Sequence, residues 1–309
     1  MITTIFSKSR PFNYILVTCL LTVCFVVIQS GQVDGIGFGL ALAKKAAFLV
    51  ILVGSLFITN FVTKRNGLSK DSTYPFLFFF LFLILFPSVL LDSKIVVSNF
   101  FLLLAMRRLV SLQSLITPKE KIFDASLWVF VAALFHFWAI LFILLVFISI
   151  FFHVSRDYRN WIIPYIAFFG VATTYLLFAV VFNKTLISDM ISQAQIDMTF
   201  TYFRNKFENI AFSIFAAIAF LFFFAQLISL PGKPLILHAS YKKVVFCFVI
   251  AVVVFVISPG KDNSLLVYTF MPLSIMATSY IESLQIKTVR EVALLILIAA
   301  CLLSYFAQL

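Results

Sequence analysis

Long apolar runs separated by short polar segments make up most of the chain. Runs of about 20 apolar residues are typical of transmembrane helices. The pattern therefore predicts an all-α, polytopic transmembrane helical bundle that forms a single integral membrane domain over residues 1–309. The expected helices cover residues 12–29, 46–62, 74–90, 95–106, 161–182, 210–229, 244–257, 265–281 and 292–306, with one further apolar stretch at 123–154.

The stretch 123–154, FDASLWVFVAALFHFWAILFILLVFISIFFHV, contains no Pro and no Gly. At about 30 residues it is too long for one crossing, which takes about 20 apolar residues, and too short for two full ones. It forms either one long tilted helix or a hairpin of two short helices. The choice decides the side of the membrane on which every later loop lies, and whether His136 is in mid-membrane or near a surface.

The distribution of basic residues favours the hairpin. With a hairpin, sixteen of the 23 basic residues share the side of the N-terminus. These are Lys8, Arg10, Lys64, Arg65, Lys70, Arg107, Arg108, Lys119, Lys121, Arg156, Arg159, Lys233, Lys242, Lys243, Lys287 and Arg290. A single helix would divide the basic residues more evenly. Because cytoplasmic loops are enriched in Lys and Arg, we expect a hairpin, about eleven crossings (9–11), a cytoplasmic N-terminus and an external C-terminus.

The longest polar segment, 183–209, contains an amphipathic stretch. Ile187, Met190, Ile191 and Met198 recur at helical spacing, and Asp189 lies on the opposite side. This spacing predicts a helix at about 185–200 that lies in the membrane interface. A solvated loop is the alternative.

The composition excludes a soluble domain. The chain is 63% hydrophobic and 11% charged, and its mean hydropathy is +1.13. Ordinary soluble proteins are about half apolar and a quarter charged. The net charge of +11 comes from short clusters that flank the apolar runs, so it indicates topology and attraction to membrane lipid rather than nucleic-acid binding. We expect a multi-pass protein of the bacterial cytoplasmic (inner) membrane.

Several classes of active site are excluded by their missing motifs. The sequence has no Walker loop, no GxSxG and no HExxH, which argues against ATP-driven chemistry and zincin proteases. Three histidines are too few for an iron site of the histidine-rich oxygenase or desaturase type. The four cysteines lie within apolar runs without metal-ligand spacing, and we interpret them as packing residues. No metal site is predicted from these residues.

Two residues are candidate catalytic groups. Asp34 follows the first helix in a glycine-rich loop, SGQVDGIGFG, and is a candidate general base at the membrane surface. A solvated turn aspartate is the alternative, because Asp-Gly pairs favour turns. His136 is flanked by aromatic residues near the expected tip of the hairpin. A packed, hydrogen-bonded histidine is the alternative there.

Five further residues are candidate substrate-binding groups on the same predicted face. Lys261 and Asp262 lie in the loop SPGKDNS, where the cation could hold a phosphate near the head of a lipid carrier. Arg204 and Lys206, in YFRNKFEN, either contact a phosphate or anchor the interfacial helix. Asp92 lies in a short turn on the same face. For Lys261 and Asp262, a polar turn between two helices is the alternative.

The layout is similar to the type C membrane glycosyltransferases, which use polyprenyl-phosphate sugars at the outer face. Three features carry the likeness: Asp34 in the first outer loop, the paired short helices in KIFDASLWVFVAALFHFWAILFILLVF, and a charged loop before a Pro-containing helix in KDNSLLVYTFMPLSIMATSYIE. The resemblance implies a polyprenyl-phosphate carrier as donor, Asp34 as base or ligand of a divalent cation, and Lys261 near the phosphate. The chain departs from that family in having one acid in the first loop and no large outer domain.

The chain also resembles an uncharacterised bacterial family of inner-membrane proteins of about 300 residues, which begin like FSKSRPFNYIL. Three functions stay open. The first is an enzyme that transfers a sugar or similar group from a lipid carrier. The second is a non-enzymatic component or partner of an envelope-assembly or secretion machine, and the third is a transporter, although no internal repeat is visible.

Overall fold

The structure is a computed structural model that describes residues 2–31, 38–182, 185–199 and 206–308. Within these ranges it contains helices and no strand, so the all-α prediction is confirmed. The α-helices are α1 (Ile2–Phe6), α2 (Pro11–Ser30), α3 (Phe38–Arg65), α4 (Tyr74–Leu85), α5 (Ser93–Ser111), α6 (Pro118–Phe135), α7 (Ile143–His153), α8 (Arg159–Phe182), α9 (Thr185–Gln193), α10 (Lys206–Ser229), α11 (Leu235–Ile257), α12 (Val267–Ser283) and α13 (Lys287–Gln308). Short 3-10 helices are η1 (Pro87–Leu90), η2 (Leu112–Ser114), η3 (Phe137–Phe142), η4 (Leu230–Gly232) and η5 (Asn263–Leu266).

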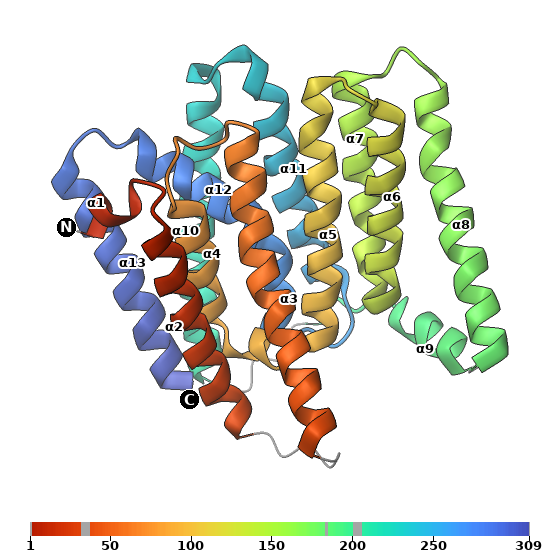
Figure 1. The fold of residues 1–309 in the computed structure, drawn as a ribbon, viewed down its shortest axis with the longest axis horizontal. Helices are drawn as coiled ribbons and strands as arrows, with labels where there is room; N and C mark the ends of the chain where they lie inside the picture. Colours follow the sequence, from red (N-terminus) through yellow and green to blue (C-terminus); the bar gives the residue numbers. More distant parts are fainter. Residues whose placement is uncertain (1, 32–37, 183–184, 200–205, 309) are drawn as a thin grey trace.

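The long helices run side by side between two ends of a bundle (Figure 1). We call the end with Arg65, Arg108 and Lys121 the Arg108 end. The opposite end, with Asp92, His136 and Asp262, is the His136 end. Helix α5 runs from the His136 end to the Arg108 end. At 1.5 Å per residue it is about 28 Å long, close to the thickness of the bilayer core.

The protein is a multi-pass membrane protein. Within the described ranges, 8 helices are long and apolar enough to cross a membrane. Helix α4 and the η3–α7 segment are apolar but shorter, and α6 carries charged residues in its first two turns. The predicted number of about eleven crossings counts these three helices as well, and it stays a prediction.

Helices α4 and α12 form the centre of the bundle. Every residue of α4, YPFLFFFLFLIL, is buried, as expected for a helix that is apolar on all sides. Helix α12 packs against it. The Phe270 ring of α12 lies 6.0 Å from Phe79, 5.9 Å from Phe82 and 6.2 Å from Phe86, centroid to centroid. These aromatic contacts hold the two central helices together.

The stretch 123–154 folds as a hairpin. Helix α6 ends at Phe135, His136 adopts an extended backbone (φ −144°, ψ 109°), and η3 and α7 return along α6 (Figure 1). Lys119, near the start of α6, places its Nζ 3.4 Å from Oδ2 of Asp157, just after α7. Both ends of the hairpin therefore lie at the Arg108 end. The hairpin prediction is confirmed, and its first helix begins five residues earlier, at Pro118.

Hydrogen bonds place the two terminal helices relative to α4. Asn13 Nδ2, near the start of α2, donates to Thr73 Oγ1, just before α4. Gln308 Nε2, at the end of α13, donates to the carbonyl oxygen of Leu85, where α4 ends. The N-terminal segment therefore lies at the Arg108 end and the end of α13 at the His136 end.

The predicted amphipathic helix at 185–200 is shorter than expected, because α9 ends at Gln193. Further along, the carboxylate of Asp197 accepts hydrogen bonds from N and Oγ1 of Thr199. Such local bonds compete with helical hydrogen bonding. The backbone N–H of Asp197 also donates to the carbonyl oxygen of Ile257, which draws this segment onto the end of α11.

Candidate functional site

Three helix starts meet at the His136 end. Asp92, His136 and Asp262 are the N-cap residues of α5, η3 and η5. Asp92 accepts hydrogen bonds from the backbone N–H groups of Lys94 (3.1 Å) and Ile95 (3.2 Å). Asp262 accepts one from the backbone N–H of Asn263 (2.6 Å). Both carboxylates satisfy N–H groups that the first helical turn leaves free.

His136 links the hairpin to the loop after α11. Its Nε2 lies 2.9 Å from Oγ of Ser258, within hydrogen-bond distance. Its ring centroid lies 5.8 Å from that of Tyr268. Burial lowers the pKa of His136 to about 4, although the charge of Asp92 acts in the opposite direction. The imidazole is therefore neutral at pH 7, so one ring nitrogen donates a hydrogen bond and the other accepts one.

Lys261 and Asp262 lie at the same end, but each already has a structural contact. Lys261 is buried, and its Nζ donates to the carbonyl oxygen of Asp197. Burial raises the pKa of the Asp262 carboxyl above its ordinary value, and the hydrogen bond from the N–H of Asn263 offsets part of that rise. Lys206 is exposed at the first position of α10. The structure thus gathers Asp92, His136, Lys261 and Asp262 at one end.

Asp34 and Arg204 lie outside the described residues. In the described part of the chain, no group of three or more His, Cys, Asp or Glu side chains lies close enough to hold a metal ion. The divalent cation that the glycosyltransferase resemblance implies would have Asp34 as its ligand.

Among the buried polar atoms without a hydrogen-bond partner, which occur in several parts of the bundle, four lie in elements of the His136 end. They are Ser88 Oγ in η1, Asn99 Nδ2 in α5, Trp138 Nε1 in η3 and Asn263 Oδ1 in η5. Buried polar atoms are nearly always paired in folded proteins. Their occurrence in the elements of the His136 end is compatible with a polar ligand or water there.

An apolar groove of about 350 Å³ opens beside the His136 end. Helices α10, α11 and α12 and the last residue of η5 form it, with Phe215, Phe255, Leu266 and Thr269 among its lining residues. Phe255 precedes Ser258 by one helical turn, and Leu266 follows Asn263 within η5. The groove therefore runs toward the loop that holds Ser258 and Asp262, and its lining suits a hydrocarbon chain.

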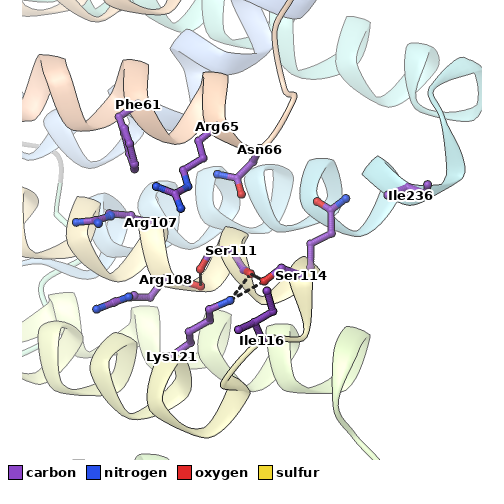
Figure 2. Close-up of a pocket in the computed structure, with 11 residues that line it drawn as sticks. Phe61, Arg65, Asn66, Arg107, Arg108, Ser111, Ser114, Ile116, Lys121 and Ile236 are labelled. Atoms are coloured by element: carbon purple, nitrogen blue, oxygen red, sulfur yellow. Dashed lines mark hydrogen bonds between the residues drawn. The ribbon is translucent and has the colours of Figure 1, made fainter.

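A pocket lined by basic side chains lies at the opposite, Arg108 end (Figure 2). It has a volume of about 550 Å³. Arg65, Arg107, Arg108 and Lys121, from α3, α5 and α6, line it together with polar and apolar side chains. The sequence marks Arg107 and Arg108 only as topology signals. The signal that could have found the pocket is the recurrence of basic clusters at three successive helix ends on one predicted side.

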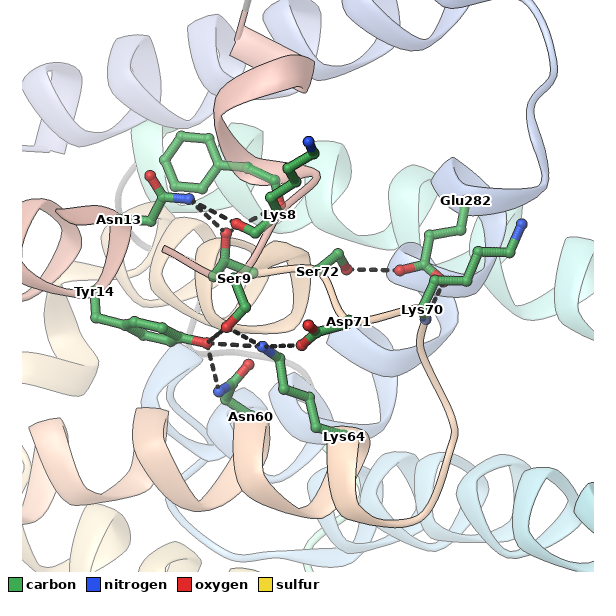
Figure 3. A network of polar contacts seen from close by, with 12 residues as sticks. Lys8, Ser9, Asn13, Tyr14, Asn60, Lys64, Lys70, Asp71, Ser72 and Glu282 are labelled. Atoms are coloured by element: carbon green, nitrogen blue, oxygen red, sulfur yellow. Dashed lines mark hydrogen bonds and ion pairs between the residues drawn. The ribbon is translucent and has the colours of Figure 1, made fainter. Parts of the chain in front are cut away.

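A network of polar contacts lies elsewhere at the Arg108 end (Figure 3). Lys64 Nζ donates to Ser9 Oγ, to Tyr14 Oη at 3.0 Å and to Asp71 Oδ1 at 3.0 Å. The contacts join α2, α3 and the loop that follows α3. Two donors in the same loop, the Ser72 hydroxyl (2.6 Å) and the Lys70 N–H (2.9 Å), form hydrogen bonds to the carboxylate of Glu282 in α12. We interpret this network as structural, because Lys64 and Asp71 form an ion pair and the Glu282 carboxylate is held by neutral donors within the protein.

The sequence profile of the family of unknown function DUF6427 matches residues 1–309. The chain belongs to this family. The membership agrees with the resemblance to an uncharacterised family and assigns no activity. No curated protein and no solved structure matches the chain. The functional argument for this family member therefore rests on the geometry of its two ends.

Proposed function

We propose that this DUF6427 protein acts at the His136 end on a lipid-linked substrate, and that it transfers a sugar or similar group from a polyprenyl-phosphate carrier. The observation that carries the proposal is the convergence of Asp92, His136 and the loop 258–262 beside an apolar groove. These segments are far apart in sequence. A carrier lipid has a long apolar chain and a charged head, which a groove next to polar groups would accommodate.

The charge distribution supports an orientation for this activity. The basic clusters that flank α3, α5, α6 and α7 lie at the Arg108 end. By the positive-inside rule this end faces the cytoplasm. We therefore propose a bacterial inner-membrane protein with a cytoplasmic N-terminus, an external C-terminus and the His136 end at the outer face.

The residues take the following roles in the proposed transfer. A base, Asp34, removes the proton from an acceptor hydroxyl, whose oxygen attacks the anomeric carbon of the sugar. The bond from that carbon to the phosphate oxygen breaks, and polyprenyl phosphate leaves. Lys261, Lys206 and Arg204 stabilise its charge. His136, as a neutral imidazole, positions the acceptor or the donor by a hydrogen bond, and Asp92 and Asp262 bind sugar hydroxyls.

A complementation experiment tests this proposal. A deletion strain would carry the wild type, Asp34→Asn, His136→Ala or, as a matched control, His238→Ala. His238 Nε2 contacts the carbonyl oxygen of Lys233 at the Arg108 end. The deletion strain should accumulate lipid-linked sugar, measured by mass spectrometry of lipid extracts, and lose surface glycan. Asp34→Asn and His136→Ala should do the same when their membrane levels equal that of the wild type, and His238→Ala should not. Unchanged glycans in the deletion strain would exclude the enzyme.

The alternative is a non-enzymatic partner of an envelope-assembly or secretion machine. It is favoured by the internal bonds of Asp92, Lys261 and Asp262, which a purely structural role would also need. This alternative predicts that the deletion strain keeps its lipid-linked sugars but loses assembly of one envelope complex. A transporter is the third possibility, and uptake of labelled substrate into vesicles would support it.

A further inference from the structure

We propose that the pocket at the Arg108 end binds a phosphate group, carried by an anionic lipid or by a small soluble phosphate compound. The site is separate from the one proposed at the His136 end, so the two proposals can fail independently. Four cationic side chains, from α3, α5 and α6, line one pocket (Figure 2). Arginine and lysine side chains from several elements that converge on one cavity are the usual groups that bind phosphate.

Two of these cations are held together by a neutral side chain. The guanidinium of Arg65 lies 5.4 Å from the ring centroid of Phe61, and that of Arg107 lies 5.1 Å from the same ring. Cation–π contacts stabilise each guanidinium without neutralising it. Two like charges beside one ring repel each other, and an anion between them would relieve that repulsion.

The acids near the pocket leave its charge largely uncompensated. Within the described residues, no acidic side chain lines the pocket. Arg108 Nη2 lies 2.8 Å from Oδ2 of Asp124, and this is the one ion pair that the four cations form in the described ranges. Lys121 Nζ donates instead to neutral acceptors, the Ser111 carbonyl (2.8 Å) and Ser114 Oγ (2.7 Å). Four positive charges thus face one negative charge.

A fifth basic residue lies behind the pocket. Lys243 of α11 is 0% exposed, and its Nζ donates to the carbonyl oxygen of Leu109, the residue after Arg108. Its other contact is His153 Nε2 at 3.1 Å, which is not an acid. When its amine is protonated, Lys243 therefore adds to the positive potential at the pocket.

The size and rim of the pocket indicate what can enter. A volume of about 550 Å³ is enough for a headgroup or a small phosphorylated molecule. Ile116 and Ile236 on its rim are 67% and 75% exposed. Ile116 is held between Leu115 (φ 53°) and Thr117 (φ 42°), both in the left-handed region that non-glycine residues rarely adopt. Strained backbone of this kind clusters at binding sites.

Topology alone does not account for this arrangement. Basic residues at cytoplasmic helix ends satisfy the positive-inside rule wherever they point. Arg156 and Arg159, which follow α7 at the same end, satisfy this rule although they do not line the pocket. Basic pockets between transmembrane helices at the cytoplasmic face bind anionic headgroups. The observation that indicates a ligand is therefore that the four basic side chains line one cavity.

The test uses the full chain, purified and placed in nanodiscs. The pocket variant is Arg107→Gln with Arg108→Gln, and the matched control is Arg156→Gln with Arg159→Gln, which removes the same charge at the same end. Retained lipid is counted by native mass spectrometry in phosphatidylglycerol and in phosphatidylcholine nanodiscs. The thermal shift caused by inorganic phosphate and glycerol phosphate is measured in phosphatidylcholine alone. Arg65→Gln, an exposed position, is the second variant if the double variant does not fold.

We expect phosphatidylglycerol to bind at least about tenfold more weakly to the pocket variant than to wild type, with less than a twofold change in the control. That result identifies a lipid headgroup as the ligand. A phosphate-induced thermal shift that only the pocket variant loses, with no lipid preference, supports the proposal with a soluble phosphate compound as ligand. Equal losses in pocket and control variants, or binding of neither probe to wild type, would overturn it.

Discussion

The ammonium nitrogen of Lys243 lies 3.1 Å from Nε2 of His153 in the interior of the bundle. The same nitrogen donates to the carbonyl oxygen of Leu109 at 2.6 Å. When Lys243 is protonated, its ammonium group can only donate, so Nε2 of His153 accepts and the proton of a neutral imidazole is on Nδ1. The pair joins α11, α7 and α5 beneath the basic pocket.

Replacing Lys243 should therefore destabilise the protein. Lys243→Ala removes a fully buried side chain and leaves the Leu109 carbonyl and His153 without their donor. We expect a loss of about 2–4 kcal/mol in the free energy of unfolding, seen as a lower Tm in detergent. Lys242→Ala is the control, because Lys242 is exposed, and should cost less than about 0.5 kcal/mol. If Lys243→Met is as stable as wild type, the cost of burying the ammonium cancels its hydrogen bonds.

The stability of the protein should depend on pH through His136. Its pKa is about 4 in the folded protein, against an ordinary histidine value of 6.5, so the unfolded chain binds more protons between these values. The stability that the neutral imidazole contributes is present above pH 6.5 and is lost as the pH falls toward 4, by about 3 kcal/mol in total.

The measurement is the Tm of the wild type and of His136→Gln at about pH 7.5 and about pH 4.5, on either side of the ordinary histidine pKa. Groups that titrate equally in both proteins cancel in this comparison. The wild type should lose more Tm than the variant between the two pH values. Parallel losses would mean that His136 titrates normally in the folded state.

The hairpin predicts the sides on which two loops lie. A reporter fused after Asn160 should read as cytoplasmic, and one fused after Gly260 should read as external. The physical basis is the Lys119–Asp157 contact at the Arg108 end, together with the excess of basic residues there. An external reading after Asn160, with an N-terminal tag in the cytoplasm, would contradict the hairpin in the membrane and the proposed outer site.

Close packing of α3 on α5 predicts different tolerance at two helical glycines. A Cβ added to Gly54 would lie 3.0 Å from Cε2 of Phe100, whereas one added to Gly170 in α8 meets nothing within 4 Å. Gly54→Leu should lower the stability by about 1–3 kcal/mol because the Phe100 ring has to move. Gly170→Leu should be neutral or stabilising, since leucine favours helix more than glycine does. Equal effects on Tm in detergent would show that α3 and α5 can separate at little cost.

The hairpin was predictable because its evidence lies along the chain. The length of the run at 123–154 left two possibilities, and the basic residues in the flanking loops were enough to choose between them. The amphipathic helix was overestimated for a different reason. The spacing from Ile187 to Met198 is helical, but the side-chain bonds of Asp197 and its attachment to Ile257 are specific contacts that periodicity does not reveal.

The sequence by itself determined that the protein is an all-α membrane bundle with a strongly basic end, because helix length, apolarity and flanking charge are local properties of the chain. The tertiary structure alone decided which helices are central and which side chains meet. Arg65, Arg107 and Lys121 share one pocket because α3, α5 and α6 pack side by side. Asp92, His136 and Asp262 share one end because their helices start there. Such contacts depend on packing between distant segments, which no local pattern encodes.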